Sequence, residues 1–302
     1  MTSRTESIPH PSGAARSGHS RTDARQPRTP AGRLWKRFLR QPLALAGLAF
    51  TLLIVLAALF AHQIAPGNPF ATIGAALQSP SSAHWLGTDD LGRDVFAELI
   101  HGARVSLFVG FAVALGSTLI GLLVGGIAGF VGGWVDDLLM RVTELFQLLP
   151  RFFLAILVAA LFGSSIFIIV VLLALTFWPA TARLLRGQVL SLRAREFVFA
   201  ARATGAREWV IFARHVLPNA LPPVMVSTAL QIGGAILVEA GLSFLGLGDR
   251  SLVSWGYMLN NAQPFIQTAW WMSIFPGLIL LLTVVSVNLV GDGLNDVFDP
   301  RA

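Results

Sequence analysis

The sequence contains no cysteine and only one lysine, Lys36. Without cysteine, a disulfide framework and a thiolate metal site are both excluded. A phosphate-binding loop of the GxxxxGKS/T type needs a lysine directly after a glycine-rich turn, whereas Lys36 lies in the stretch RLWKRF. The chain therefore cannot be a P-loop ATPase, and if ATP drives it, another subunit hydrolyses that ATP.

Charged residues are scarce as well, at 13% of 302 residues, against roughly 25% in soluble domains. Hydrophobic residues make up 54% of the chain, and its mean hydropathy is +0.68. Several apolar runs approach or exceed the ~20 residues that cross a bilayer, which predicts a multi-pass membrane protein. The net charge of +6 does not point to a nucleic-acid partner, because the arginines cluster beside apolar runs, where they more often set membrane orientation.

Six apolar runs predict an all-α integral membrane protein with six transmembrane helices, near residues 43–62, 105–131, 138–162, 166–186, 219–247 and 271–291. Residues 1–33 are rich in Ser, Pro, Gly and Arg without apolar periodicity, which predicts a disordered tail; a transit peptide is the alternative. Basic residues precede the first run as in a signal peptide, but five further runs and no convincing cleavage site favour an uncleaved anchor. Prolines interrupt or flank spans three to five and predict kinks there, namely Pro150, Pro179, Pro222 and Pro223.

The basic residues predict the orientation of the chain. With the N-terminus in the cytoplasm, most of them lie inside: four before the first span, Arg141 after the second, and seven between the fourth and fifth spans, namely Arg183, Arg186, Arg193, Arg195, Arg202, Arg207 and Arg214. Only Arg93, Arg104 and Arg250 remain outside. We therefore expect the segment between spans four and five to face the cytoplasm.

Small residues recur every four positions along the second span, namely Ser117, Gly121, Gly125, Gly129 and Gly133. This spacing places them on one stripe of a helix, where they let the backbone of a second helix approach closely. We expect tight helix packing along the stripe, with a substrate path along it as the alternative.

The loop between the fourth and fifth spans reads EFVFAARATGAREW over residues 196–209. Apolar residues before and within it are spaced for one face of a helix, namely Leu190, Ala194, Phe197 and Ala201. Gly205 then suits the turn at a helix C-terminus. A second short helix is expected to follow and to end at Pro218, with apolar residues on one side, namely Trp209, Phe212 and Val216. The apolar edge of such helices fits either a lipid surface or a groove on a partner protein.

The stretch AARATGAREWVIFARHVLP, residues 200–218, resembles the loop motif of the permeases of ATP-binding-cassette importers. The matching positions are the alanine pair, the glycine and the final Leu-Pro, namely Ala200, Ala201, Gly205, Leu217 and Pro218. The acid that usually precedes the alanines is replaced by Phe199, with Glu196 one turn earlier, and the usual isoleucine is His215. These departures are typical of the dipeptide and oligopeptide branch of the family.

Further stretches resemble the C-type permease subunit of that branch, namely HWLGTDDLGRDVF (84–96), GGWVDDLLMRV (132–142), LSFLGLG (242–248) and FPGLILLLTVVSVNLVGDGLNDVFDP (275–300). The resemblance covers residue 34 to the end and implies the type I importer permease fold. The expected parts are a cytoplasmic tail (1–33), an anchor helix (34–63), an extracytoplasmic segment (64–103), the permease domain (104–295) and a cytoplasmic C-terminal tail (296–302).

The resemblance also implies a mechanism in the bacterial cytoplasmic membrane, with both termini inside. A related permease would complete the pathway, an extracytoplasmic binding protein would deliver the substrate, and two ATPase subunits would bind ATP and Mg²⁺. The loop helix would be the coupling helix, seated in a groove of one ATPase, and its implied residues are Glu196, Phe197, Ala200, Ala201, Arg202, Gly205, Leu217 and Pro218. The branch transports dipeptides and oligopeptides; nickel, glutathione and related small solutes are the alternatives.

Two charged residues fall inside the expected spans. Glu239 lies toward the outer end of the fifth span, where snorkelling or a structural hydrogen bond is expected and a substrate contact is the alternative. Arg151 follows Pro150 in the third span, where it would line a cavity or pair with an acid of the partner permease.

Motifs of catalysis or metal binding are not found in the sequence. GTDDLGRD lacks the alternating acids and the closing Glu of a calcium loop, GLSFLG lacks the second glycine of GxSxG, and the six histidines show no HxxxH spacing. We expect no catalytic residue, cofactor site or metal site in this chain. A self-sufficient secondary transporter and a membrane enzyme stay as alternatives, although we see no clear internal repeat and no acid–base constellation.

Overall fold

The structure is a computed structural model that describes residues 37–298, so the predicted tail, residues 1–33, lies outside the described range. Within that range the chain forms helices and loops without a strand; the helices are α2 (Pro42–Leu59), α3 (Ala61–Ile64), α4 (Val95–Val131), α5 (Gly133–Leu148), α6 (Arg151–Phe162), α7 (Ile166–Arg193), α8 (Glu196–Ala203), α9 (Glu208–Ile211), η1 (Phe212–Val216), α10 (Leu217–Phe244), α11 (Trp255–Ala262), η2 (Gln263–Phe265) and α12 (Trp271–Phe298). The last helix thus continues past residue 295, where the sequence predicted the start of a tail.

Five helical segments are long and apolar enough to cross a membrane, namely α2, α4, α7, the continuous run Glu208–Phe244 and α12. The pair of α5 and α6 passes the same test together, but it is bent by 76°. Counted as one broken span, this pair makes six. The all-α multi-span architecture is confirmed, and the kink predicted at Pro150 in the third span is confirmed as a full break between two helices.

Pro150 explains the break between α5 and α6. Helix α5 ends at Leu148, and Leu149 is extended, with φ −79° and ψ 123°. A residue before proline is disfavoured in the α-helical region, and Pro150, which has no backbone N–H, forms the N-cap of α6. Pro179, by contrast, lies inside α7 without ending it.

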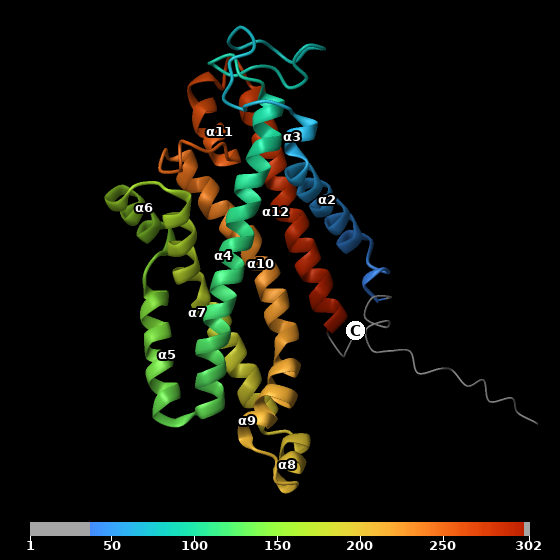
Figure 1. The fold of residues 1–302 in the computed structure, drawn as a ribbon, viewed down its shortest axis with the longest axis vertical. Helices are drawn as coiled ribbons and strands as arrows, with labels where there is room; N and C mark the ends of the chain where they lie inside the picture. Colours follow the sequence, from blue (N-terminus) through green and yellow to red (C-terminus); the bar gives the residue numbers. More distant parts are fainter. Residues whose placement is uncertain (1–36, 299–302) are drawn as a thin grey trace, which may run out of the picture.

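Helices α4 and α7 run side by side along the stripe of small residues (Figure 1). A Cβ atom added to Gly121 would lie 2.6 Å from the Cβ of Thr181, and one added to Gly125 would overlap the backbone carbonyl of Ala182. The stripe is buried from Ser117 through Gly129, so the predicted tight helix packing is confirmed. We call this contact the α4–α7 seam.

A buried glutamine of α10 joins the seam through hydrogen bonds. The Ser117 hydroxyl of α4 donates to Gln231 Oε1 at 2.8 Å, and Gln231 Nε2 donates to the Thr181 hydroxyl of α7 at 2.8 Å. All three side chains are buried, and buried polar groups are stable only where they are hydrogen-bonded in this way. The three helices therefore form one packed unit.

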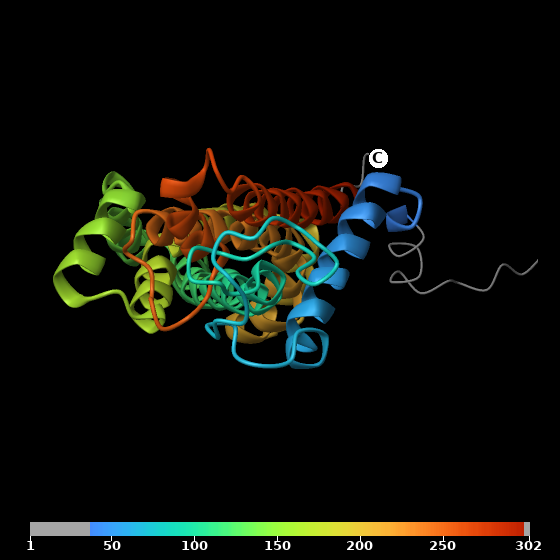
Figure 2. The same ribbon diagram turned by 90° about the horizontal axis from the view of Figure 1, so that it is seen from above.

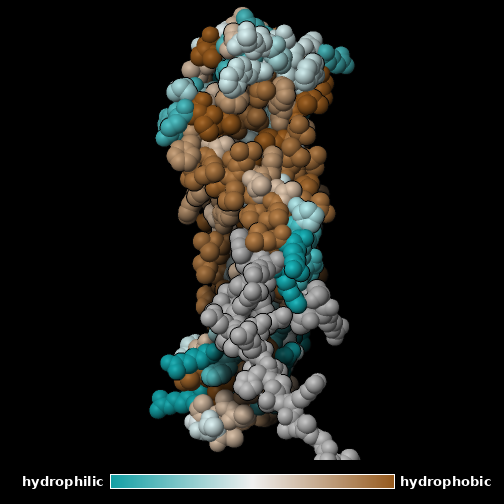
Figure 3. Space-filling view, turned by 90° about the vertical axis from the view of Figure 1, so that its right-hand side faces the viewer, coloured by the Kyte–Doolittle hydropathy of each residue, from teal (hydrophilic) through white to brown (hydrophobic). Residues whose placement is uncertain are grey.

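The remaining elements flank this unit or lie at its ends (Figures 1 and 2). Helices α2 and α12 lie on one flank and α5 and α6 on the other, while α8 and α9 lie at one end and α11, with residues 65–94, lies at the opposite end. On the face that carries α2, apolar residues cover the middle of the molecule and hydrophilic residues gather toward its two ends (Figure 3). This banding is the one expected of a chain that crosses a bilayer.

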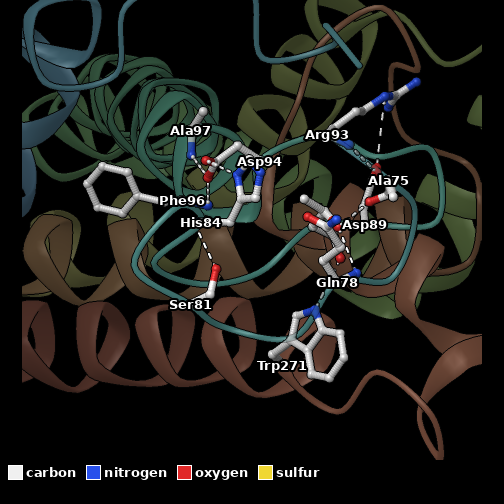
Figure 4. A network of polar contacts seen from close by, with 11 residues as sticks. Ala75, Gln78, Ser81, His84, Asp89, Arg93, Asp94, Phe96, Ala97 and Trp271 are labelled. Carbon is white, nitrogen blue, oxygen red and sulfur yellow. Dashed lines mark hydrogen bonds and ion pairs between the residues drawn. The ribbon is translucent and has the colours of Figure 1, made fainter. Parts of the chain in front are cut away.

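The loop segment of residues 65–94 is held by its own polar groups (Figure 4). Asp89 Oδ1 accepts backbone N–H groups from Leu91 at 2.9 Å and Arg93 at 2.7 Å, and burial raises the pKa of the Asp89 carboxyl above its usual value. Trp271 of α12 donates its indole N–H to the Thr88 carbonyl at 3.1 Å. The hydrogen bonds that Asp89 accepts order the loop. Within residues 37–298 no group of three His, Cys, Asp or Glu side chains could hold a metal ion.

Candidate functional site

The predicted loop motif lies at the end of the molecule occupied by α8 and α9 (Figure 1). Helix α7 ends at Arg193 and α8 begins at Glu196, with Arg195 extended between them. The predicted continuous helix face through Ala194 and Phe197 is therefore wrong. The buried side chain of α8 is Val198, at 0% exposure, and not Phe197.

Gly205 forms the turn that ends α8. Its φ of +79° lies in the left-handed region, which glycine adopts without strain. Its N–H bonds the Arg202 carbonyl at 2.9 Å, and the N–H of Ala206 bonds the Ala201 carbonyl at 3.2 Å. This pair of hydrogen bonds is the Schellman motif, so the predicted role of Gly205 as a helix-terminating residue is confirmed.

Arg202 links the two short helices. Its guanidinium binds the Glu208 carboxylate of α9 at 2.6 and 3.1 Å, and this hydrogen bonding raises the pKa of Arg202 further. The guanidinium also lies over the ring of Phe199, at 5.9 Å from its centre. The angle between α8 and α9 is thus held by side chains as well as by the turn.

Helix α8, the Gly205 turn and α9 together form an elbow of residues 196–211. The base of this elbow is fixed to the membrane-spanning helices. Buried apolar residues of α7, α8, α9, η1 and α10 form one cluster, namely Leu185, Val189, Leu192, Val198, Ile211, Phe212, Val216, Ala220 and Val224. Arg193 of α7 donates to the carbonyls of Gly129 and Phe130 at the end of α4, at 2.9 and 2.5 Å. Displacement of α8 would therefore displace α7, α10 and α4 with it.

Helix α9 leads through the π-helical turn η1 directly into α10. The second short helix was predicted to end at Pro218, and that prediction is wrong. Pro218 lies directly after the π-helical turn, within the continuous helical run Glu208–Phe244, and does not end it. Leu217 and Pro218 therefore belong to the spanning helix that follows, whereas the other motif residues lie in α8 and its turn.

The tip of the elbow exposes aromatic side chains. Phe197 is 37% exposed, Phe199 56% and Trp209 65%, and Glu196, Ala200 and Gly205 are exposed beside them. Phe199 and Trp209 were not among the predicted site residues, although two large apolar residues in an arginine-rich loop were a usable signal. Large apolar side chains gathered at an exposed site are typical of surfaces that bind a partner.

The two charged residues within the spans have different surroundings. Glu239 is buried at 3% exposure, and its Oε1 accepts the Ser243 hydroxyl at 2.7 Å, which is the predicted structural hydrogen bond. Arg151 begins α6 and lies over the ring of Phe177, at 4.7 Å from its centre.

Residues 121–302 match the family described as "Binding-protein-dependent transport system inner membrane component". Residues 29–80 match "N-terminal TM domain of oligopeptide transport permease C". The two matches lie in the order in which the sequence predicted an anchor helix and a permease domain.

Several relatives are similar over most of their length. The glutathione transport system permease protein GsiD of Pectobacterium atrosepticum is 40% identical over 277 residues, which cover 91% of this chain and 92% of the relative. The dipeptide transport system permease protein DppC of Bacillus subtilis is 39% identical over 273 residues, covering 88% and 84%. A putative peptide permease protein of Brucella suis is 42% identical over 277 residues, covering 90% and 92%.

A solved structure shares the fold. It shows inward-facing conformations of the MetNI methionine ABC transporter, and it matches with a TM-score of 0.54 and 18% identity over 67% of this chain and 97% of that chain. The fold is therefore that of an ABC importer permease. By its family match and its full-length relatives, the chain belongs to the binding-protein-dependent transport system inner membrane components, a family of transporter subunits and not of enzymes.

Proposed function

We propose that this chain is a permease subunit of an ATP-driven importer of dipeptides or oligopeptides. Two of the three relatives above are named for dipeptide or peptide transport. The third is named for glutathione, which is itself a tripeptide. A peptide-sized substrate with a free carboxylate accounts for all three names.

The proposed orientation places α8 in the cytoplasm and residues 65–94 outside. Seven arginines lie between positions 183 and 214, at and near the α8 end, whereas the opposite end carries Arg93, Arg104 and Arg250. Loops rich in Lys and Arg stay on the cytoplasmic side. Both termini then lie in the cytoplasm, because the chain crosses the membrane six times when the α5–α6 pair counts as one crossing.

In this proposal α8 is the coupling helix, and the exposed aromatic tip on a rigid base is the observation that carries the assignment. Phe197 and Phe199 are exposed on α8, while Val198 between them is locked into the cluster with α7 and α10. A groove of an ATPase subunit would bind the tip in the helix-in-groove manner. Movement of the ATPase pair would then reorient the attached helices as a rigid body.

The proposed partners are a related permease, two ATPase subunits and an extracytoplasmic binding protein. Binding of ATP and Mg²⁺ is assigned to the ATPase subunits, since Lys36 cannot form a phosphate-binding loop here. The related permease would cover the flank of α5 and α6, where large apolar side chains are exposed, including Trp134, Leu148, Phe153 and Phe162.

Reconstitution of the purified complex tests this function. Proteoliposomes that contain the chain, its partner permease and the ATPases should accumulate a labelled tripeptide only with internal ATP and loaded binding protein outside. Nickel ions and reduced glutathione are added as competitors, and their effect on uptake of the labelled tripeptide is measured. Transport by the single chain without ATP would contradict the proposal and favour a secondary transporter.

Single-cysteine variants test the orientation, because the natural sequence has no cysteine. Phe199→Cys, at the exposed tip of α8, should react with a membrane-impermeant maleimide only in inside-out vesicles. Ser251→Cys, an exposed position beyond α10, should react only in right-side-out vesicles. The reverse pattern would overturn the orientation.

A further inference from the structure

A cleft of about 490 Å³ opens between α5 and α7. Helix α5 lies on the flank opposite α2 (Figure 1). Its lining is almost entirely charged and consists of Asp137, Met140, Arg141, Glu144, Arg183 and Arg186. Arg186 is bound by Asp136 through two hydrogen bonds of 2.5 and 2.7 Å. Within residues 37–298 no hydrogen bond or ion pair engages the side chains of Arg141, Glu144 or Arg183. The cleft therefore holds charges of both signs that the chain itself does not pair.

Helix geometry places this cleft at the inner edge of the membrane. Gly125 of α4 contacts Ala182, the neighbour of Arg183. From Arg104 to Gly125, α4 rises roughly 31 Å at about 1.5 Å per residue, close to the ~30 Å thickness of a bilayer core. With Arg104 at the outer edge, Arg183 and the cleft lie at the inner edge.

Arg151 lies deeper in the membrane than the cleft. It contacts Phe177, which precedes Arg183 by six residues on α7. Phe177 therefore lies roughly 9 Å nearer the membrane centre than Arg183. Within residues 37–298 no carboxylate comes within 4.0 Å of Arg151. Arginines at such depth are costly and almost always face a bundle interior or a water-filled cavity, where they pair with another group. Among residues 37–298, Arg151 therefore has no carboxylate partner.

The surroundings of Arg151 favour an anion. It is the first residue of α6, and no side chain caps that helix, so the N–H groups of the first turn lack acceptors and the positive end of the helix dipole is open. The Cζ atom of Arg151 lies over the Phe177 ring, and within residues 37–298 no hydrogen bond engages the guanidinium N–H groups, which are donors for oxygen atoms. A planar guanidinium suits a carboxylate bound through two oxygens.

We propose that the α5–α7 cleft and Arg151 line the translocation path, and that Arg151 binds the carboxylate of the peptide in transit. This rests on the peptide import and the orientation proposed above. A peptide carries an ammonium group and a carboxylate, and the cleft offers carboxylates and guanidinium groups for both. Its volume falls within the ~300–1,000 Å³ of small-molecule sites. Several weak charged contacts in series let a substrate bind and still leave.

A matched pair of peptides tests the proposal in the complete transporter. The probes are a tripeptide with uncharged side chains and a free C-terminal carboxylate, and the same tripeptide with a C-terminal amide, each supplied on saturated binding protein to proteoliposomes. Arg151→Gln should lower uptake of the free-acid peptide about 10-fold or more, the usual loss for a charged hydrogen bond, and should leave uptake of the amide nearly unchanged. Arg151→Lys should retain part of the uptake. Arg40→Gln, an exposed position before α2, is the matched control and should behave as the parent.

Two further measurements on the same vesicles separate this role from others. ATP hydrolysis stimulated by loaded binding protein should stay within about twofold of the parent in Arg151→Gln. An equal loss of uptake for both peptides would overturn the proposal and assign Arg151 to packing. Loss of the second permease from the purified complex would overturn it as well and assign Arg151 to the subunit interface. If the parent itself imports neither peptide, the proposed function fails instead.

Discussion

The α4–α7 seam and the α8 tip are built on opposite principles. In the seam, Gly121 and Gly125 let the backbones of two helices come into contact, and every residue of the stripe from Ser117 to Gly129 is buried. At the tip, Phe199 and Trp209 are more than half exposed although they are large and apolar.

This difference separates what the chain completes alone from what it leaves to partners. A seam of small residues is satisfied by its own packing, because helices in a membrane associate through close van der Waals contact. The aromatic side chains at the tip of the elbow expose apolar area to solvent, and only contact with a second surface would bury it. Changes in the seam should therefore damage the fold, and changes at the tip should damage transport while leaving the fold intact.

The largest expected effect is in the seam. Gly125→Val would drive a branched side chain into the backbone of Ala182, an overpacking that costs about 3 kcal/mol or more. We expect at least a 10-fold loss of folded protein in the membrane, measured by detergent-solubilised yield and thermal unfolding. Gly187→Val on α7 is the control, because nothing lies within 4 Å of a Cβ added there; equal yields of the two variants would contradict the close packing.

At the tip we expect an equally large loss of transport without a loss of protein. Ala200→Asp puts a charge on an exposed position of α8, which would be buried in an apolar ATPase groove. Uptake of peptide should fall more than 10-fold while yield and unfolding temperature match the parent. Ala194→Asp, exposed at the end of α7, should leave uptake within about twofold. Normal uptake by Ala200→Asp would count against the coupling role.

The sequence predicted the seam better than the elbow, for a physical reason. A period of four among small residues reports helix packing directly, so Gly121 and Gly125 lie where they were expected. The apolar period through Leu190, Ala194 and Phe197 continued across the break between α7 and α8 at Arg195, which only the extended backbone reveals. Apolar spacing alone therefore joined two helices that the structure separates.

Proline positions show the same limit. Kinks were expected at Pro150 and Pro179 alike, yet Pro150 separates two helices at 76° while Pro179 remains inside α7. A proline within a span is tolerated where neighbouring groups satisfy the freed backbone, so the presence of proline alone does not fix where a helix ends. Residue types in the loop pointed to Phe199, but its exposure depends on how α8 packs against α7 and α10, which only the structure shows.

A smaller effect is expected where α10 joins the seam. Gln231→Leu removes both hydrogen bonds to Ser117 and Thr181, and a membrane hydrogen bond is worth about 0.6 kcal/mol on average. The unfolding temperature should drop by a few degrees relative to the parent. A drop as large as that of Gly125→Val would show that the polar contacts, and not the glycines, hold the seam.

The smallest effect is expected for the exposed pair of Arg202 and Glu208. Solvent screens such pairs, and the Gly205 turn with the buried Val198 already fixes α8. Glu208→Gln should change peptide uptake less than twofold, at low and at high salt alike. A strong, salt-dependent loss would instead make this pair part of the partner contact.

Cross-linking of α8 to an ATPase subunit tests the central claim most directly. In the natural cysteine-free sequence, Ala200→Cys should form a disulfide with a cysteine placed in the groove of the co-purified ATPase, and the link should block uptake until it is reduced. Ser251→Cys at the opposite end should give no such link. Failure of Ala200→Cys to link at any groove position, in a complex that still transports, would contradict the account.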